Sequence, residues 1–194
     1  MHPSPRIGLE QYTIPANIAA DILFLAGVVY RDIEGKSIVD LGTGTGRLAI
    51  GAMLMGASRA IAVDIDPVAI NVGRENSELA NVDIDWIVGD LGAIHGTFDT
   101  VLMNPPFGTK KRHVDKIFLR KAVETGGVVY SIHKSATRSH IMRYLQRCGC
   151  EVKAIHEYTL DVPHMFEHHR KPKHPVEVDC YRIETKAARD CRQE

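Results

Sequence analysis

The fold of this chain is decided by the stretch Ser37-Ile38-Val39-Asp40-Leu41-Gly42-Thr43-Gly44-Thr45-Gly46. A short apolar segment runs into three glycines at alternate positions, and a helical segment follows them. Glycine permits a tight turn and lets a ligand approach the backbone without a Cβ atom in the way. The stretch therefore predicts a strand, a turn that can hold a cofactor, and a helix.

Outward from this stretch, short apolar segments alternate with helical ones. The predicted strands cover residues 37–41, 60–64, 85–88, 98–103, 128–131, 151–158 and 176–184. The predicted helices cover residues 15–30, 46–55, 67–80, 115–125 and 136–147. Because parallel strands need long crossover connections, the alternation predicts a doubly wound α/β fold with a seven-stranded, mostly parallel sheet and an antiparallel final strand.

The length of 194 residues predicts a single domain. Its parts are a leader and helix in 1–35 and an α/β core in 36–194, with a basic loop at 160–175. No apolar run approaches the roughly 20 residues that span a bilayer, and no secretory start is visible, so we expect a cytoplasmic protein without membrane contact. The four cysteines show neither a CxxC pair nor a disulfide framework, which predicts reduced thiols.

The formal net charge is zero, but the charges are unevenly distributed. Residues 1–97 hold 6 Lys plus Arg against 12 Asp plus Glu, whereas residues 98–194 hold 18 against 12. The two halves therefore carry −6 and +6. An anionic partner such as a nucleic acid is expected at the second half.

Acidic residues lie at or just beyond the carboxyl ends of three successive predicted strands, at Asp40, Asp64 and Asp90. Open α/β sheets place their ligands at the carboxyl ends of their strands. We expect Asp64 to accept hydrogen bonds from ribose hydroxyls and Asp90 from an adenine amino group, while Asp40 favours a cationic ligand over a pyrophosphate. Together these features indicate S-adenosylmethionine, although each acid alone would also suit a turn or a helix cap.

The motif Asn104-Pro105-Pro106-Phe107 follows the predicted strand 98–103. The side-chain oxygen of Asn104 and the carbonyl oxygen of Pro105 are placed to accept the two N–H groups of a planar amine, which favours a pyramidal, nucleophilic nitrogen. Proline restricts the backbone, and Phe107 offers a ring on which a base can stack. The motif predicts methylation of an amine or amide nitrogen; the plainer interpretation is a turn that ends a strand.

Five segments of the chain resemble the methyltransferase-like protein 5 family. They are Leu9 to Tyr12, Asp40 to Gly46, Asn104 to Lys110, Ser131 to Ser135 and Val176 to Asp179. The resemblance spans nearly the whole chain, and the composition is similar to that of an archaeal member. It implies a class I, Rossmann-like methyltransferase that uses S-adenosylmethionine to make N6-methyladenosine in small-subunit ribosomal RNA.

The resemblance also implies roles for single residues. The catalytic residues would be Asn104, Pro105, Pro106 and Phe107. The cofactor would lie among Gln11, Tyr12, Asp40, Gly42, Thr43, Gly44, Thr45, Asp64, Ile65, Asp90, Leu91 and Asn104. One departure is Ile14, which stands where the family usually has threonine, so no hydroxyl contact is expected there.

Basic and aromatic residues beside the target motif and in the late loop are expected to bind RNA. They are Lys110, Lys111, Arg112, His133, Lys134, Phe166, Arg170, Lys171 and Lys173. A solvated helix start would explain the first three equally well, and a loop that anchors the next helix would explain His133 and Lys134. The histidines of the late loop match no structural zinc pattern, so we expect no metal.

The predicted strand 85–88 is expected at an edge of the sheet, where its open backbone and Trp86 would be offered to another chain. Eukaryotic members of the resembling family use a small zinc-containing activator protein. A partner strand docking near Trp86 would be analogous.

Three other functions stay open. A protein glutamine N5-methyltransferase acting on a release factor needs the same two acceptors, but such enzymes usually show Tyr in place of Phe107 and a long helical domain before the glycine turn. DNA adenine methyltransferases commonly add a target-recognition domain, for which this chain has no room. A non-catalytic RNA-binding module on the same scaffold is the third, and Asp40 and Asn104 argue against it.

Overall fold

The computed structural model describes residues 14–107, 114–161 and 175–186. The helices are α1 (Ala16–Phe24), η2 (Leu25–Val29), α2 (Arg47–Leu54), α3 (Pro67–Leu79), η3 (Leu91–Ala93), α4 (Val114–Thr125), η4 (Ser135–Thr137) and α5 (Arg138–Arg147). The strands are β1 (Ser37–Leu41), β2 (Arg59–Asp64), β3 (Asp85–Val88), β4 (Phe98–Met103), β5 (Gly126–Lys134), β6 (Glu151–Asp161) and β7 (Pro175–Glu184).

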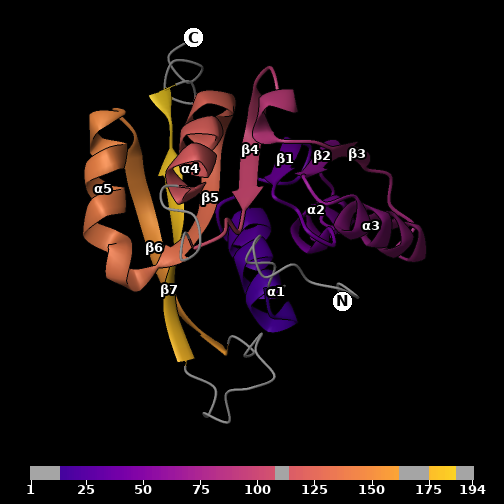
Figure 1. Ribbon diagram of the computed structural model, residues 1–194, viewed down its shortest axis with the longest axis horizontal. Coiled ribbons are helices and arrows are strands. Elements are labelled where there is room, and N and C mark those ends of the chain that lie inside the picture. The colour runs from indigo at the N-terminus through magenta and orange to yellow at the C-terminus, as the bar shows by residue number, and fades with distance from the viewer. Residues whose placement is uncertain (1–13, 108–113, 162–174, 187–194) are drawn as a thin grey trace.

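A single twisted sheet forms the centre of the described part of the molecule (Figure 1). Its seven strands follow the order β3-β2-β1-β4-β5-β7-β6. Neighbouring strands are parallel except at β7, which runs antiparallel to both β5 and β6. The predicted doubly wound α/β fold with an antiparallel final strand is confirmed, and β3 lies at an edge as expected.

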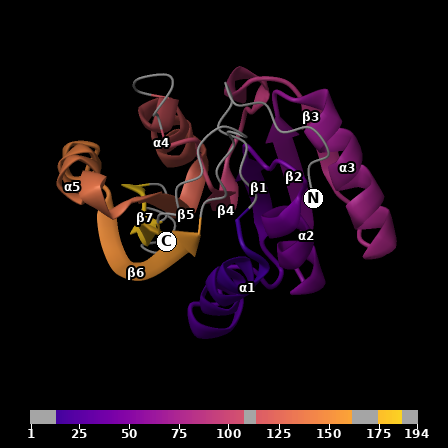
Figure 2. The ribbon, with the colours of Figure 1, turned by 60° about the horizontal axis from the view of Figure 1, so that its bottom comes forward.

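Helices cover both faces of this sheet (Figure 2). One face packs against α1, α2 and α3, through a core that includes Ile22 and Ala49. The other packs against α4 and α5, through a core that includes Leu119 and Leu145. Each helix therefore buries one apolar side against the sheet, which is why the strands read as nearly continuous apolar runs.

Several element boundaries differ from the sequence prediction, and two of the differences change how a segment is interpreted. Strand β5 continues to Lys134 rather than stopping at Ser131, because β7 extends the ladder by pairing Cys180 with Ile132 and Val178 with Lys134. The predicted helix 15–30 is an α-helix only as far as Phe24 and then widens into the π-helical turn η2.

Strands β6 and β7 extend past the end of β5. Leu160 pairs with Val176 beyond the last β5 partner in β7, and Figure 1 shows this extension beside α1. The Tyr158 hydroxyl donates a hydrogen bond of 2.6 Å to Asp21 and so ties the extension to α1. Because β6 runs in the same direction as β5, the extension lies at the carboxyl edge of the sheet. Within the described ranges, no helix is both long and apolar enough to cross a membrane.

Candidate active site

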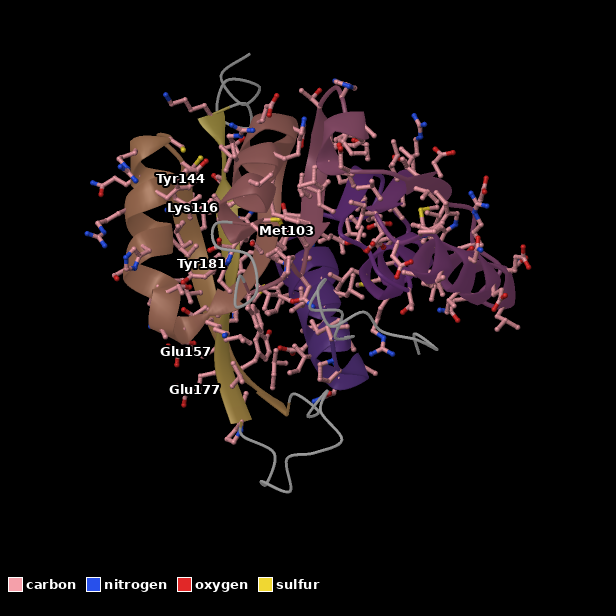
Figure 3. The ribbon with its side chains drawn as sticks, in the orientation of Figure 1. Met103, Lys116, Tyr144, Glu157, Glu177 and Tyr181 are labelled. Carbon is pink, nitrogen blue, oxygen red and sulfur yellow. The ribbon has the colours of Figure 1, made fainter. Side chains whose placement is uncertain are left out.

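The glycine turn and the asparagine-proline motif each begin directly after a strand, and the two strands are neighbours that end at the same register position. Leu41 of β1 pairs with Met103 of β4, so Gly42 and Asn104 are the next residues along two parallel strands. Such strands lie about 4.8 Å apart. Figure 3 labels Met103 at the end of β4. The cofactor turn and the target motif therefore share one edge of the sheet.

The three glycines of the turn have different surroundings, although all adopt a positive φ. A Cβ atom on Gly42 would lie 2.8 Å from the ring of Phe118, and one on Gly46 would lie 2.4 Å from the ring of Trp86. At Gly44, no atom of the described residues other than its chain neighbours lies within 4 Å of that position. Gly42 and Gly46 therefore admit aromatic rings, whereas Gly44 leaves its approach open to a ligand.

The buried carboxylate of Asp40 stabilises the turn through hydrogen bonds. The side chain is 1% exposed, and its Oδ2 accepts hydrogen bonds from Thr43 Oγ1 at 2.7 Å and from the Ala49 backbone N–H at 3.1 Å. Burial raises the pKa of Asp40 to about 7, against the lowering effect of these two hydrogen bonds and with help from the charge of Asp64. Asp40 thus fixes the turn to the amino end of α2, where the helix dipole favours a negative charge.

The carboxylate of Asp64 is half-buried and also holds the turn. Its Oδ2 accepts a hydrogen bond of 2.9 Å from Gly44 N–H, and its Oδ1 accepts one of 2.9 Å from Asp66 N–H. Carboxylate oxygens are acceptors, the kind of group that receives hydrogen bonds from ribose hydroxyls. Ile65, directly after it, is 58% exposed.

Asp90 lies on the next strand connection at the same edge. Val88 pairs with Asp64, and Asp90 follows two residues later with an exposed carboxylate. Its Oδ1 accepts a hydrogen bond of 2.7 Å from Gly92 N–H and caps η3, while Leu91 packs against the core shared with α4. The structure therefore brings the acids of three strand ends to one edge.

The leader enters the fold beside this turn. Gln11 and Tyr12 lie outside the described residues. Ile14, the first described residue, is buried, and its carbonyl accepts a hydrogen bond from the guanidinium of Arg47, the first residue of α2. The chain thus arrives at the helix that begins at the glycine turn.

The target motif combines a buried proline with partly exposed neighbours. Pro105 is buried, whereas Asn104 and Pro106 are half-buried. Phe107 packs partly against the core under α1, and Lys134 Nζ lies 5.4 Å from the centroid of its ring. The structure therefore brings the predicted catalytic ring and one predicted RNA-binding residue together.

The predicted RNA contact of His133 is corrected by its burial. The side chain is 2% exposed, its Nε2 lies 2.6 Å from Ser131 Oγ, and its ring meets Tyr181 edge-on at 5.9 Å. Burial lowers the pKa of His133 to about 4, despite the opposing charges of Asp115 and Asp179. His133 is a neutral core residue of β5, which the longer strand explains.

A polar cluster beside His133 was not predicted from the sequence. Asp179, 0% exposed, accepts hydrogen bonds of 2.7 Å from both Nε and Nη2 of Arg138, one of 2.6 Å from Ser135 and one of 2.9 Å from Tyr181. Burial works to raise the pKa of Asp179, but these hydrogen bonds hold it below its usual value. Figure 3 shows Tyr181 between the sheet and the helices, with Glu157 and Glu177 nearer the β6–β7 extension. The sequence feature that could have indicated this cluster is the alternation of apolar and acidic residues in Val176-Glu177-Val178-Asp179, within a predicted strand.

The ring of Trp86 turns into the fold. A Cβ atom on Gly73 of α3 would lie 2.5 Å from it, and Gly46 approaches it from the turn. The ring is therefore partly buried, and the backbone edge of β3 beside it stays the predicted docking edge for another chain.

Seven predicted RNA-binding residues lie outside the described ranges: Lys110, Lys111, Arg112, Phe166, Arg170, Lys171 and Lys173. Within those ranges, no group of three or more His, Cys, Asp or Glu side chains is arranged to hold a metal ion. The described cysteines, Cys148, Cys150 and Cys180, form no disulfide with one another.

Known proteins match this chain either over its first half or over nearly its whole length. The family model of ribosomal protein L11 methyltransferase (PrmA) matches residues 19–105, which include the glycine turn and end inside the target motif. Over nearly the whole length, the rRNA N(6)-adenosine-methyltransferase METTL5 of Danio rerio is 37% identical and covers 92% of this chain and 90% of its own. An uncharacterized protein of Methanocaldococcus jannaschii is 39% identical over 94% of this chain and 88% of its own, in keeping with the predicted archaeal character.

A solved structure shares the whole fold. The crystal structure of PH1948 from Pyrococcus horikoshii superposes with a TM-score of 0.87 at 38% sequence identity, covering 95% of this chain and 91% of that one. The similarity extends through β6 and β7 and is not confined to the cofactor half.

Proposed function

Because this chain belongs to the METTL5 family of rRNA N(6)-adenosine-methyltransferases, we propose that it methylates N6 of an adenosine in small-subunit ribosomal RNA. The observation that carries the proposal is the pairing of Leu41 with Met103. It sets the cofactor turn and the Asn104 motif on adjacent strands, at the edge where open α/β sheets bind their ligands.

The methyl donor is S-adenosylmethionine, which carries the transferable methyl group on a sulfonium sulfur. The residues present fit this molecule. Gly44 leaves room at the turn, the half-buried carboxylate of Asp64 is an acceptor group suited to ribose hydroxyls, and the exposed side chain of Ile65 offers apolar surface for an adenine ring. Gln11, Tyr12, Thr43, Thr45, Asp90 and Leu91 complete the proposed cofactor site.

The target motif supplies the acceptors for the reacting amine. An exocyclic adenine nitrogen is a weak nucleophile, because its lone pair is delocalised into the ring. Asn104 Oδ1 and the Pro105 carbonyl accept its two N–H groups and favour a pyramidal nitrogen whose lone pair points away from both acceptors. The rigid Pro105-Pro106 backbone fixes these acceptors before the base arrives, and Phe107 stacks on the base.

The RNA backbone is proposed to meet the basic residues that flank the motif and those of the late loop. They are Lys110, Lys111, Arg112, Arg170, Lys171 and Lys173, with Phe166 as a stacking residue. The outer edge of β3, with which no other described strand pairs, is a proposed docking edge for a small zinc-containing activator protein, through backbone hydrogen bonds. A ribosomal RNA substrate supports our placement of the protein in the cytoplasm.

The test supplies labelled S-adenosylmethionine with separate pools of ribosomal RNA, tRNA, DNA and release factor. We expect label in small-subunit ribosomal RNA, recovered as N6-methyladenosine, and at most a trace of it with Asn104→Ala. Label in the release factor would establish the glutamine methyltransferase, which whole-length similarity to METTL5 does not favour. Absence of label from every pool, with cofactor bound, would support the non-catalytic module.

A further inference from the structure

We propose that the exposed sides of α4 and α5 bind the phosphate backbone of the ribosomal RNA that flanks the target adenosine. This role rests on the proposed function and adds residues of two described helices to the RNA contact. The residues are Lys116 and Arg120 of α4 and Arg143 and Arg147 of α5, all of them exposed. We call these four residues the α4–α5 basic surface.

Charge separates the helices on the two faces of the sheet. Together, α4 and α5 hold six Lys plus Arg against two Asp plus Glu. On the opposite face, α1, α2 and α3 together hold two against three. A surface with charges of one sign attracts a polymer of the other sign, so a polyanion is favoured at α4 and α5 and not at the opposite face.

Four of the six basic residues on α4 and α5 are not neutralised by acidic neighbours. Lys121 forms an ion pair of 3.8 Å with Glu124, and Arg138 is paired with both Glu157 and Asp179. Among the described residues, no member of the α4–α5 basic surface takes part in an ion pair. The four charges are therefore available for phosphates.

The Arg120 side of α4 faces α5. Burial raises the pKa of Tyr144, on α5, to about 12 with help from a hydrogen bond to Cys148, and the positive charge of Arg120 opposes this rise. Lys121 leaves α4 on the other side, where its Nζ donates a hydrogen bond of 3.0 Å to the Ile94 carbonyl. The two helices therefore present Arg120 and Tyr144 toward each other.

Helical spacing places the other basic residues beside this pair. Lys116 lies four residues before Arg120, so both share one side of α4. On α5, Arg147 lies three residues after Tyr144 and four after Arg143, so these three are also neighbours. Figure 3 shows Lys116 and Tyr144 between α4 and α5. The four charges thus lie along the adjoining sides of the two helices.

The α4–α5 basic surface begins beside the proposed target site. Because α5 follows the carboxyl end of β5 through η4, and α4 ends where β5 begins, both helices run from the carboxyl edge of the sheet to its amino edge (Figure 1). Lys116 lies in the first turn of α4, at the edge that carries the target motif, whereas Arg147 ends α5, about 13 Å from its first residue. A nucleic-acid strand carries a phosphate at every nucleotide, so a strand that leaves the site along this surface meets several of these charges.

The experiment measures binding of small-subunit ribosomal RNA at several salt concentrations, together with kcat and KM. Arg120→Gln, Arg143→Gln and Arg147→Gln each remove one charge and keep a good helix former, and a triple variant combines them. A second triple variant combines Arg120→Lys, Arg143→Lys and Arg147→Lys and so keeps the charges. The matched control is Arg74→Gln, at an exposed position of α3 on the opposite face. Melting temperature and cofactor affinity show whether each variant is folded, and the single variants decide if the triple glutamine variant does not fold.

We expect each single glutamine variant to weaken RNA binding about five- to tenfold at about 0.1 M salt. The slope of log affinity against log salt concentration should fall by about 0.7–0.9 for each charge removed, and by about 2–3 in the triple glutamine variant. The triple lysine variant and Arg74→Gln should keep the slope. With saturating RNA, kcat should stay within about twofold, because these side chains act on bound RNA and not on the reacting amine.

An unchanged slope in the glutamine variants would overturn the inference and leave the α4–α5 basic surface to solvent or to an acidic protein. An equal loss in Arg74→Gln, or a fallen slope in the triple lysine variant, would overturn it as well. RNA binding is measured without methyl transfer, so the proposed function is judged separately. Ribosomal RNA that the unaltered protein binds but leaves without label would refute that function.

Discussion

The cofactor side and the target side of this site are built in different ways. On the cofactor side, Asp40 and Asp64 hold the glycine turn through hydrogen bonds to Thr43, Ala49 and Gly44. On the target side, Phe107 rests on the apolar core and on Lys134, which comes from another strand. A turn held by local hydrogen bonds is preorganised by its own sequence, whereas the target side depends on strands meeting in register. Substitutions should therefore affect cofactor binding on one side and turnover on the other.

The largest effect is expected from Asn104→Ala. Loss of one acceptor that acts on the reacting amine should lower kcat by about 10²–10³-fold, as removal of a preorganised hydrogen-bonding group does in other enzymes. Cofactor affinity, measured by calorimetry, should stay within about twofold, because Asn104 acts on the amine. Unchanged turnover would remove Asn104 from the chemistry. A matching loss of cofactor affinity would place it on the cofactor side.

The paired variants Gly44→Ala and Gly46→Ala separate ligand access from packing. In Gly46→Ala the new Cβ atom would lie 2.4 Å from the Trp86 ring, and alanine would have to adopt a positive φ. This substitution should lower the free energy of unfolding by about 2–4 kcal/mol. In Gly44→Ala only the positive φ is unfavourable, so the free energy of unfolding should fall by about 1–2 kcal/mol. Cofactor binding should nevertheless weaken by more than about tenfold, because the added methyl group occupies the space proposed for the ligand. Denaturant unfolding and calorimetry measure the two quantities. Normal cofactor affinity in Gly44→Ala would show that the open space is not the cofactor site.

Asp179→Asn tests the polar cluster on the target side. The hydrogen bonds that lower the pKa of Asp179 stabilise the fold above the ordinary carboxyl pKa, and this stabilisation is lost as pH falls through the lowered value. The variant should melt about 3–6 °C lower at pH 7 and lose less stability than the unaltered protein on acidification. Melting curves from pH 7 to pH 3 provide the comparison. Parallel curves for the two proteins would contradict the ionised state of Asp179.

The smallest effect concerns the pH dependence of cofactor binding. Because burial raises the pKa of Asp40 to about 7, its carboxyl gains negative charge as pH rises from 6 to 8, which favours a cationic ligand. Affinity should rise by a few-fold over this range in the unaltered protein, and less in Asp40→Asn, which keeps an oxygen for Thr43 and Ala49. The same raised pKa means that ionisation costs stability as pH rises from about 4 to about 7. Identical affinity profiles in both proteins would contradict the assignment.

The sequence predicted those parts of the molecule that depend on local pattern. Strands 85–88 and 98–103 match β3 and β4 at both ends, since apolar runs flanked by turn residues define them without help from distant segments. The placement of the site at the carboxyl edge followed from the parallel order of the strands. The glycine turn was likewise predicted from local sequence alone, by three alternate glycines after an apolar segment.

Other features depend on contacts between distant segments. The ladder with β7 lengthens β5 and buries His133, although β7 begins more than 40 residues later in the chain. Trp86 turns inward because two glycines from different segments, Gly46 and Gly73, leave space for its ring. Asp40 lies near the end of a strand as expected, but the direction of its carboxylate, toward the backbone N–H of Ala49 in α2, depends on how that helix packs. None of these contacts has a signature in local periodicity.

The most direct test of the shared edge is a crystal structure of the protein with a non-reactive S-adenosylmethionine analogue that carries an amino group in place of the transferable methyl. We expect this group to point toward Asn104 Oδ1 and the Pro105 carbonyl, with the nucleoside hydroxyls at Asp64. An analogue whose amino group faces away from the Asn104 motif, or a motif closed off by packed side chains, would contradict the account.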